Sequence, residues 1–360
     1  MKKVYIWPFA LRISHFIMII SFFGAYFSEG FIHAFFGSLF GALVILRIIW
    51  GFVGTKYSRF KDFELKGLFA YLKSALQAKH QNFIGHNPAS SLFVLVMLGI
   101  SVFLVVLGYL ASGSEEGVGY FAFMLENYSS FAWIKDAHEV LANALLAIVC
   151  VHICGAFLDC VLNKAAASKS MINGYKNSYE NVELHKFHRL FSAFWLLGIL
   201  LSAFYLLSPK NTLFALGLQP VDYKAQNSDF AHECAQCHTL YAPFMQTSDK
   251  HEKIMANLEN HFGDDASIDD ETNKKILEFL RQNSAEKSSS KWAIKFAKND
   301  DIAITSSPFW QKAHENLDKE IFKRDKIKSK ANCAACHENI EKGLISKALI
   351  KYEAIKWLII

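Results

Sequence analysis

Five long apolar segments constrain the fold of this chain more than any other feature of its sequence. Each is close to the ~20 residues that an α-helix needs to cross the hydrocarbon core of a bilayer. A membrane-spanning backbone must satisfy its own hydrogen bonds, which segments of this length do as helices. We therefore predict an all-α transmembrane bundle of five spans, at roughly 9–27, 31–53, 90–111, 137–162 and 190–208.

Composition supports this interpretation. Hydrophobic residues make up 52% of the 360 residues and charged residues only 20%, whereas soluble domains are about 25% charged. A disordered chain and a single soluble enzyme are therefore both poor interpretations. The whole net charge of +5 lies in residues 1–208, which hold 16 Lys and Arg against 11 Asp and Glu. No basic stripe suggests a nucleic-acid partner, and membrane lipid is the expected surrounding.

The loops predict the orientation of the bundle. The loop at 54–89 carries six Lys or Arg and the loop at 163–189 carries five, but the loop at 112–136 carries one. Basic loops stay in the cytoplasm. We therefore expect a protein of the bacterial inner membrane, with a cytoplasmic N-terminus and a periplasmic second half. The first segment follows Met-Lys-Lys like a signal peptide, but its polar residues and direct continuation into a second span indicate that it is retained.

The second half is polar and mostly helical by pattern, with apolar spacing at 250–262 and 271–283 and Asp269 as a candidate cap. Residues 284–290 (SAEKSSS) resemble an internal linker. The C-terminal segment is apolar with three Lys, and we expect it to pack on its own domain rather than along the bilayer surface. The predicted organisation is a membrane domain at 1–180, a fifth transmembrane helix at 181–210, a linker at 211–228, an extracytoplasmic domain at 229–343 and an amphipathic tail at 344–360.

Two copies of a Cys-x-x-Cys-His motif lie in the second half, at 234–238 and 333–337. This is the attachment signature of c-type haem. Two thiols form thioethers to the haem, namely Cys234 with Cys237 and Cys333 with Cys336. The adjacent His238 or His337 is then held under the iron as an axial ligand.

A structural or transport protein with an external zinc module is one alternative. Zinc ribbons separate their cysteine pairs by about 15–20 residues, and far more intervene here. A His after each pair is also not needed for zinc. Seven cysteines, an odd number, argue against a plain disulfide framework.

Each c-type iron needs a sixth ligand or an open position. The residues alone leave several candidates. These are His232, His251, His261, His314, Met245 and Met255.

Four histidines lie in or at the ends of the membrane segments, and we predict that they bind two b-type haems. His138 and His152 are 14 residues apart, so they share a helix face and are separated by about 21 Å along the axis. By the predicted topology, His33 and His138 lie on the outer side, and His15 and His152 on the inner side. The pairs should therefore be His33 with His138 and His15 with His152. Hydrogen bonding between helices is the alternative for a lone histidine.

Other polar residues at the inner side have open roles. Arg12 and Arg47 are candidates for haem propionate binding, with ordinary positive-inside anchoring equally favoured. His86, His185 and His188 are expected at the interface, with a lesser prospect that one of them contributes to a quinone site.

Two stretches of the chain resemble known families. Residues 5–180 resemble the bacterial cytochrome b561 and nickel-hydrogenase b-type cytochrome family, through YIWPFALRISHF, FIHAFFGSLFGALVILRIIWGFVGTKYSRFKDF, IGHNPAS and KDAHEVLANALLAIVCVH. The resemblance implies two b-haems in a four-helix bundle. Residues 229–343 resemble the di-haem cytochrome c family, through ECAQCHTLYAPF, LENHFGDDASIDDETNKKILEFL and KSKANCAACHENIEKG. That resemblance implies His-His ligation and points to His261 and His314 as distal ligands.

The expected function is electron transfer between the quinone pool and a soluble periplasmic redox protein, through two b-haems and two covalent c-haems. We expect electrons to flow outward from quinol, because a fused c-type domain can reduce soluble acceptors. The alternative is a terminal reductase or ligand-binding haem protein, which would need one iron with an open position.

Overall fold

The computed structural model describes residues 2–77, 83–162, 167–178, 185–208, 210–346 and 349–351. The strands are β1 (Lys2–Tyr5) and β2 (Tyr175–Ser178). The α-helices are α1 (Phe9–Tyr26), α2 (Gly30–Val53), α3 (Leu68–Leu76), α4 (Pro88–Glu116), α5 (Tyr128–Phe131), α6 (Trp133–Leu162), α7 (Ala167–Asn173), α8 (Lys186–Leu207), α9 (Tyr223–Gln226), α10 (Ser228–Glu233), α11 (Ser248–Met255), α12 (Asp270–Gln282), α13 (Lys291–Ala297) and α14 (Pro308–Ala313). Short 3-10 helices include η5 (Ala285–Lys287), η7 (Lys319–Lys323) and η8 (Cys333–Ala335).

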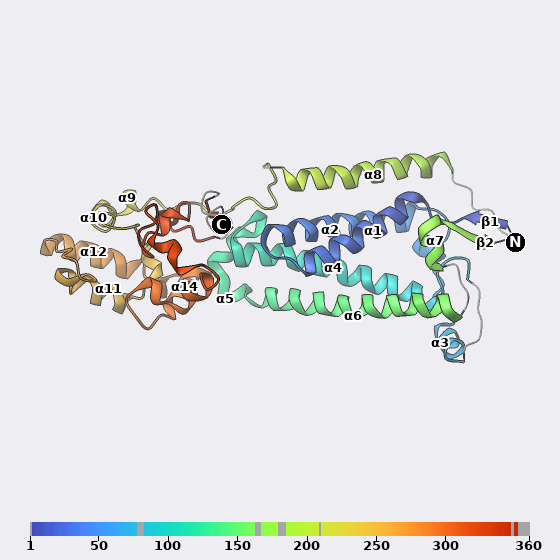
Figure 1. The fold of residues 1–360 in the computed structure, drawn as a ribbon, viewed down its shortest axis with the longest axis horizontal. Coiled ribbons are helices and arrows are strands. Elements are labelled where there is room, and N and C mark those ends of the chain that lie inside the picture. Colours follow the sequence, from blue (N-terminus) through green and yellow to red (C-terminus); the bar gives the residue numbers. More distant parts are fainter. Residues whose placement is uncertain are drawn as a thin grey trace. The chain divides into compact units, whose positions relative to one another are not determined.

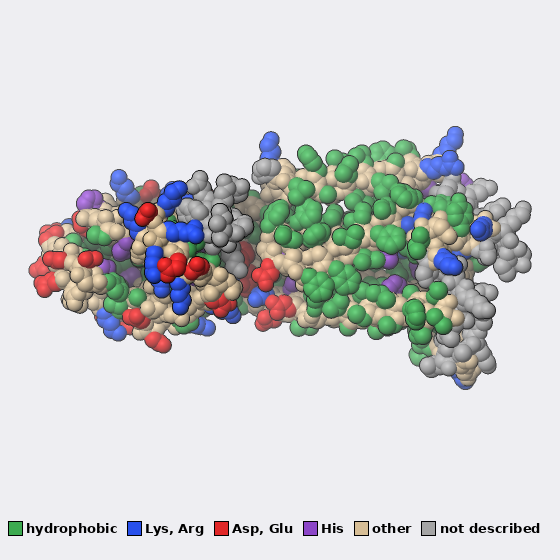
Figure 2. All heavy atoms as spheres, viewed as in Figure 1, with side chains coloured by type: hydrophobic (Ala, Val, Ile, Leu, Met, Phe, Trp, Pro, Cys, Tyr) green, Lys and Arg blue, Asp and Glu red, His purple; other side chains and the backbone are tan. Residues whose placement is uncertain are grey.

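Five of these helices are long and apolar enough to cross a membrane: α1, α2, α4, α6 and α8. They run alongside one another in Figure 1, and their positions confirm the five predicted spans. Large hydrophobic side chains stay exposed along them, as Figure 2 shows in green. A soluble protein rarely exposes so large an apolar surface, because contact with water costs free energy. A lipid environment removes that cost.

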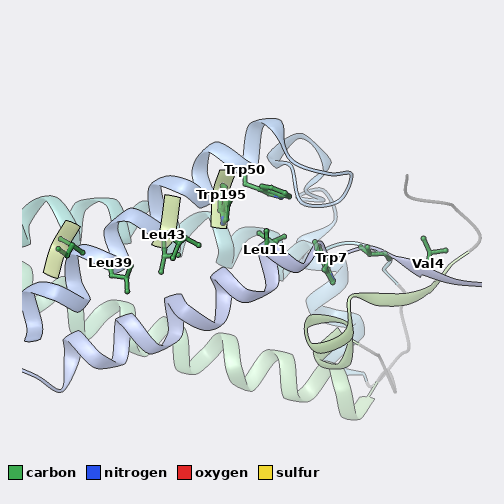
Figure 3. Packing of buried hydrophobic residues seen from close by; sticks show 11 residues of the cluster. Val4, Trp7, Leu11, Leu39, Leu43, Trp50 and Trp195 are labelled. Carbon is green, nitrogen blue, oxygen red and sulfur yellow. The ribbon is translucent and has the colours of Figure 1, made fainter. Parts of the chain in front are cut away.

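The interior of the bundle contains two apolar clusters. Phe22 of α1, Phe40 of α2, Leu104 of α4 and Leu145 of α6 pack together, so these four helices share one core. The other cluster joins α8 to α1 and α2 and is drawn in Figure 3. There the rings of Trp50 and Trp195 meet edge to face at 5.2 Å.

A two-stranded ribbon lies at the N-terminal end of the bundle, and the sequence pattern did not predict it. β1 and β2 pair antiparallel, with Tyr5 opposite Tyr175. Trp7 follows β1, and its indole donates a hydrogen bond to the hydroxyl of Ser170, 3.2 Å away. Neither strand, KKVY or YKNS, alternates apolar and polar residues, so neither shows the pattern by which a strand is recognised. The all-α class is confirmed, with this ribbon as an addition.

Contacts divide the chain into two compact units. The first comprises residues 1–109 and 134–214, and the second comprises 110–133 and 215–360. The second unit thus includes the end of α4, which stops at Glu116 because Gly117 adopts a φ of +66°. Residues 215–217, which lie in the predicted linker, form backbone hydrogen bonds with residues 117–119.

The second unit is built from short helices around one apolar core. The predicted cap is confirmed: the Asp269 carboxylate accepts hydrogen bonds from the backbone N–H groups of Glu271 and Thr272 at 3.1 and 3.0 Å. The interpretation of residues 284–290 as an internal linker is corrected at its start, which packs into this unit. Ser284 and Ala285 are buried, and the Ala285 N–H donates to the carbonyl of Gln246 at 2.9 Å.

The described part of the C-terminal tail packs on its own unit, as predicted. Leu344 and Ser346 are buried. Ile350 forms a bridge with His337, and the Lys351 ammonium donates to the Ala334 carbonyl at 2.6 Å. Residues 347–348 and 352–360 lie outside the described residues.

Candidate haem-binding sites

The structure brings His33 and His138 together between α2 and α6. Their ring centroids are 6.0 Å apart, with an angle of 73° between the ring planes. Each ring directs Nδ1 at a backbone carbonyl, His33 at Ala25 (2.8 Å) and His138 at Leu104 (3.1 Å). Nδ1 therefore carries the proton, and Nε2 is left unprotonated and able to bind a metal. Imidazoles that bind metals are held in the same way, by a hydrogen bond from the nitrogen that faces away from the metal.

The His138 ring lies close to the backbone of α4 at Gly108. A Cβ atom added at Gly108 of α4 would lie 3.1 Å from Cε1 of the His138 ring, which is tighter than ordinary van der Waals contact. A larger residue would require the ring or the helix to shift by a few tenths of an ångström. Gly108 therefore belongs to the site, although it offers no ligand.

At the side predicted to be inner, His15 of α1 lies near His152 of α6 and Arg47 of α2, close enough for electrostatic interaction. The Nδ1 atom of His15 is buried and has no hydrogen-bond partner among the described residues. The Arg47 guanidinium donates through Nη2 to the Ser58 carbonyl at 3.3 Å, and its Nη1 is buried and equally unpartnered within the described ranges. An acidic group of a cofactor would satisfy Nη1.

Arg12, the other candidate for propionate binding, is differently placed. Its guanidinium donates to the backbone carbonyls of Trp7 and Ile172. The Arg12 guanidinium thus already donates hydrogen bonds to two protein carbonyls. The geometry favours Arg47 over Arg12 as a partner for a propionate.

At the first c-type motif, His238 stands opposite His261. Their ring centroids are 6.1 Å apart and the planes differ by 27°. His238 Nδ1 donates to the Thr239 carbonyl at 2.7 Å, which leaves its Nε2 free. Burial lowers the pKa of His261, so this ring stays neutral and able to bind a metal at neutral pH.

At the second c-type motif, His337 stands opposite His314. Their centroids are also 6.1 Å apart, with 71° between the planes. His314 Nδ1 donates to the Trp310 carbonyl at 2.8 Å, and the Trp310 ring stacks on His314 at 4.4 Å. Burial is the main cause that lowers the pKa of His337 to about 4, and it also lowers the pKa of His314. Both rings are therefore neutral at pH 7.

The repeated separation of 6.0 to 6.1 Å has a simple interpretation. A metal–imidazole bond is about 2 Å long, and the ring centroid lies about 1 Å beyond the nitrogen, so two imidazoles on opposite sides of one metal have centroids about 6 Å apart. Among the residues that the structure describes, three histidine pairs have that spacing. The residues thus fit iron held between two imidazoles.

The cysteines of both motifs fit thioether formation better than zinc binding. Burial raises the pKa of Cys234 and of Cys333 to about 11 and also raises the pKa of Cys336. A structural zinc site would need four ligands gathered around one point. Within the part of the chain that the structure describes, no group of three or more His, Cys, Asp or Glu is arranged to hold a metal ion.

The two c-type motifs are in direct contact through Tyr241. Its ring stacks on His238 at 4.8 Å, and its hydroxyl donates to the Ala331 carbonyl at 2.6 Å. The same hydroxyl lies within hydrogen-bond distance of the Cys333 side chain. Beside it, the Ala334 N–H donates to the Thr239 hydroxyl at 3.2 Å. One tyrosine therefore contacts the axial histidine of the first motif and a thiol of the second.

The remaining candidates for a sixth ligand have other surroundings. His232 is exposed and contacts the Glu233 carboxylate at 2.9 Å. His251 is buried, and its Nε2 contacts the Pro243 carbonyl at 2.8 Å. Met245 and Met255 belong to the apolar core. The rings that face the motif histidines are those of His261 and His314 instead.

Three further histidines, which the sequence predicts at the interface, lie outside the opposed pairs. The His86 ring packs against Trp7 at 5.1 Å and Phe63 at 4.7 Å. His185 and His188 lie next to each other at the start of α8, with centroids 5.7 Å apart. His188 Nδ1 is buried without a hydrogen-bond partner among the residues that the structure describes.

Sequence reasoning missed Gly108, Trp310 and Tyr241. Trp310 precedes His314 by four residues, a spacing that places two side chains on one helical face, so it was detectable. Gly108 lies against His138, and the Tyr241 hydroxyl contacts Ala331 and Cys333; these partners are far away in the sequence. No local signal identifies such residues.

Two family descriptions match the chain. Residues 6–174 match "Prokaryotic cytochrome b561", and residues 230–345 match "Dihaem cytochrome c". Both resemblances noted in the sequence are confirmed by these matches.

Among curated proteins, an Escherichia coli K12 protein named "Probable Ni/Fe-hydrogenase 1 B-type cytochrome subunit" is 26% identical over 179 residues, which are 44% of this chain and 72% of that protein. A Bradyrhizobium diazoefficiens protein named "Probable Ni/Fe-hydrogenase B-type cytochrome subunit" is 24% identical over 153 residues, 38% of this chain and 62% of that protein.

Solved structures of dihaem cytochromes c are also similar in sequence to the second half. The one from Shewanella baltica is 30% identical, covers 36% of this chain and 94% of its own, and gives a TM-score of 0.30. One from Rhodobacter sphaeroides is 29% identical, covers 35% of this chain and 100% of its own, and gives a TM-score of 0.31.

Proposed function

Because the chain joins a prokaryotic cytochrome b561 domain to a dihaem cytochrome c domain, we propose that it passes electrons between the quinone pool of a bacterial inner membrane and a soluble periplasmic redox protein. The two matched domains and the apolar helices make it a membrane haem electron-transfer protein. The observation that carries the proposal is the set of opposed histidine pairs. Haem supplies the redox chemistry when bound, and the chain supplies ligands, burial and orientation.

Two b-type haems occupy the membrane unit in this proposal. His33 and His138 hold one, and His15 and His152 hold the other. The carbonyl contacts of His33 and His138 keep Nε2 directed at the metal. Arg47 pairs with a propionate of the second haem, since its Nη1 is buried near His15 without a partner among the described residues.

Two c-type haems occupy the second unit. Cys234 and Cys237 attach the first, with His238 and His261 as axial ligands. The 6.1 Å spacing of His238 and His261 supports this assignment. Tyr241 packs on the ring of His238 and stabilises its orientation.

Cys333 and Cys336 attach the second c-type haem, with His337 and His314 as axial ligands. The 6.1 Å spacing of that pair supports this choice of distal ligand, which the sequence left open. Trp310 shields His314 from water by stacking on it.

The second unit is periplasmic in this proposal, and the N-terminus is cytoplasmic. Lys and Arg in the loops at 54–89 and 163–189 support that orientation. Electrons then flow outward, from quinol through the b-haems to the c-haems. Every proposed site has two imidazoles, which favours electron transfer over a terminal reductase with an open iron.

The first experiment measures haem content by type in purified protein, where we expect two b and two c per chain. A quinol analogue added to that protein should reduce both types. If haem is present but quinol reduces none of it, the quinol-oxidising function is wrong. A large spectral change with carbon monoxide would instead favour the reductase.

A further inference from the structure

The two c-type sites lie in opposite electrostatic surroundings. The stretch around His261, residues 259–271, contains six carboxylates and no Lys or Arg. The stretch 319–330, just before the second motif, contains six Lys or Arg and two carboxylates, a net of +4. In Figure 2, acidic side chains gather at the end of the second unit where Figure 1 shows α11 and α12.

The stretch 319–330 is held against the second site by its apolar residues. Ile321 and Ile327 are buried. The Phe322 ring lies 5.7 Å from Trp310 and 6.4 Å from His314. The backbone of the stretch is therefore anchored beside the aromatic cluster that surrounds His314.

The cations themselves face solvent. Lys330 places its ammonium 5.9 Å from the centre of the Trp310 ring, directly over the residue that stacks on His314. Lys323 pairs with Glu320 at 2.7 Å. The exposed cations of this surface, which we call the basic face, are Lys319, Lys323, Arg324, Lys326, Lys328 and Lys330.

We propose that the basic face is the docking surface for a soluble redox protein with an acidic surface, and that electrons leave the chain there. This inference rests on the proposed function and specifies its partner. An acidic partner is attracted to the second site and repelled from the carboxylates around His261, so the charge pattern selects one of the two sites. Carboxylates interspersed with the cations favour a protein partner over a uniform anionic lipid surface.

The same charge pattern predicts different reduction potentials for the two c-type haems. Nearby cations stabilise the reduced form of a haem, and nearby carboxylates stabilise the oxidised form. The haem between His314 and His337 therefore has the higher reduction potential. Electrons that arrive at the first c-type site move on to the second and leave through the basic face.

The test measures binding of the full-length, haem-loaded protein, in phosphatidylcholine nanodiscs, to an acidic blue-copper protein. In the redox reaction, one electron passes from the reduced c-type haem, which becomes ferric, to Cu(II), which becomes Cu(I), and no proton moves. The variant carries Lys319→Glu, Arg324→Glu and Lys328→Glu, which changes the net charge of 319–330 from +4 to −2. A matched control carries Lys224→Glu, Lys274→Glu and Lys298→Glu, three exposed lysines outside this stretch.

We expect the variant to bind the copper protein at least about tenfold more weakly at low salt, and added salt to weaken wild-type binding. The reduction potential of the second c-haem should fall, while haem content stays unchanged. The control should bind like the wild type.

Equal binding by variant and wild type would overturn the proposal, as would an equal loss in the control. The proposal would also be overturned if the variant bound the copper protein like the wild type but no longer bound phosphatidylglycerol vesicles. Anionic lipid would then be the partner of the basic face. Chemical reduction of the protein keeps this test independent of quinol oxidation, so the two proposals can fail separately.

Discussion

The two halves of this molecule assemble haem sites in different ways. In the second unit, each proposed c-type site has three of its four attachment residues within five consecutive positions, such as Cys333, Cys336 and His337. In the membrane unit, each proposed b-type site joins residues more than a hundred positions apart, such as His33 and His138. A local motif can capture haem with little tertiary structure, whereas a distributed site exists only after helices pack. The two classes should therefore respond differently to substitution.

The largest effect is expected from the local motif. Replacing Cys333 and Cys336 by Ser removes both thioether bonds of one haem. Covalent haem should fall from two to one per chain, by haem stain and mass spectrometry, with b-haem unchanged. Serines at Cys150 and Cys154 in α6 form the control and should leave both covalent haems. Two covalent haems in the Cys333/Cys336 variant would show that the motif is not the attachment site.

A site in the membrane unit, whose ligands come from distant helices, should lose its haem when one ligand is replaced. His138→Ala should remove one of the two b-haems, because a single imidazole without covalent bonds holds haem weakly. The pyridine haemochrome spectrum would show b-haem halved and c-haem unchanged. His232→Ala, at an exposed histidine, serves as the control. An unaltered b-haem content in His138→Ala would reject this ligand.

The same kind of substitution should have a smaller effect at a covalent site. His314→Ala should leave the haem attached but convert its iron from low to high spin, since the thioethers and His337 remain. His314→Met should restore low spin with a raised reduction potential. Absorption spectra and a redox titration measure both changes. A spectrum identical to wild type would mean that another residue is the sixth ligand.

A distributed site should also depend on residues that never touch the metal. Gly108→Leu should lower b-haem occupancy in part, because its Cβ would already lie 3.1 Å from the His138 ring. Gly99→Leu on the same helix is the matched control, since none of the described atoms lies within 4 Å of a Cβ there. Comparable haem loss in both variants would indicate damage to the helix rather than to the site.

The smallest expected effect is at the contact between the two c-type motifs. Tyr241→Phe keeps the ring on His238 but removes the hydrogen bond to Ala331, which should cost about 1 kcal/mol of stability. Denaturant unfolding followed by haem absorbance measures it, with both haems still attached. No loss of stability would show that the hydroxyl contributes little to holding the motifs together.

Much of the fold was predictable because the bilayer imposes a simple rule on composition. The five spans came from hydropathy alone, and α1 and α2 begin and end within one residue of their predicted limits. The ribbon of β1 with β2 was missed because four-residue strands carry no periodic signal. The packed stretch around Ser284 was mistaken for a linker. A polar sequence does not reveal that the Ala285 N–H donates a hydrogen bond to the Gln246 carbonyl.

The amino-acid sequence by itself determined the kinds of cofactor chemistry this protein supports. Residue type and spacing were enough to identify the two Cys-x-x-Cys-His motifs and the four histidines of the apolar segments. Only the tertiary structure decided which distal histidine faces which motif, that Tyr241 connects the two motifs, and that Lys330 lies over the Trp310 ring beside the second site. The physical reason is that ligand type is a property of single residues. Opposition of two rings across 6 Å, by contrast, depends on chain packing between residues that are distant in sequence.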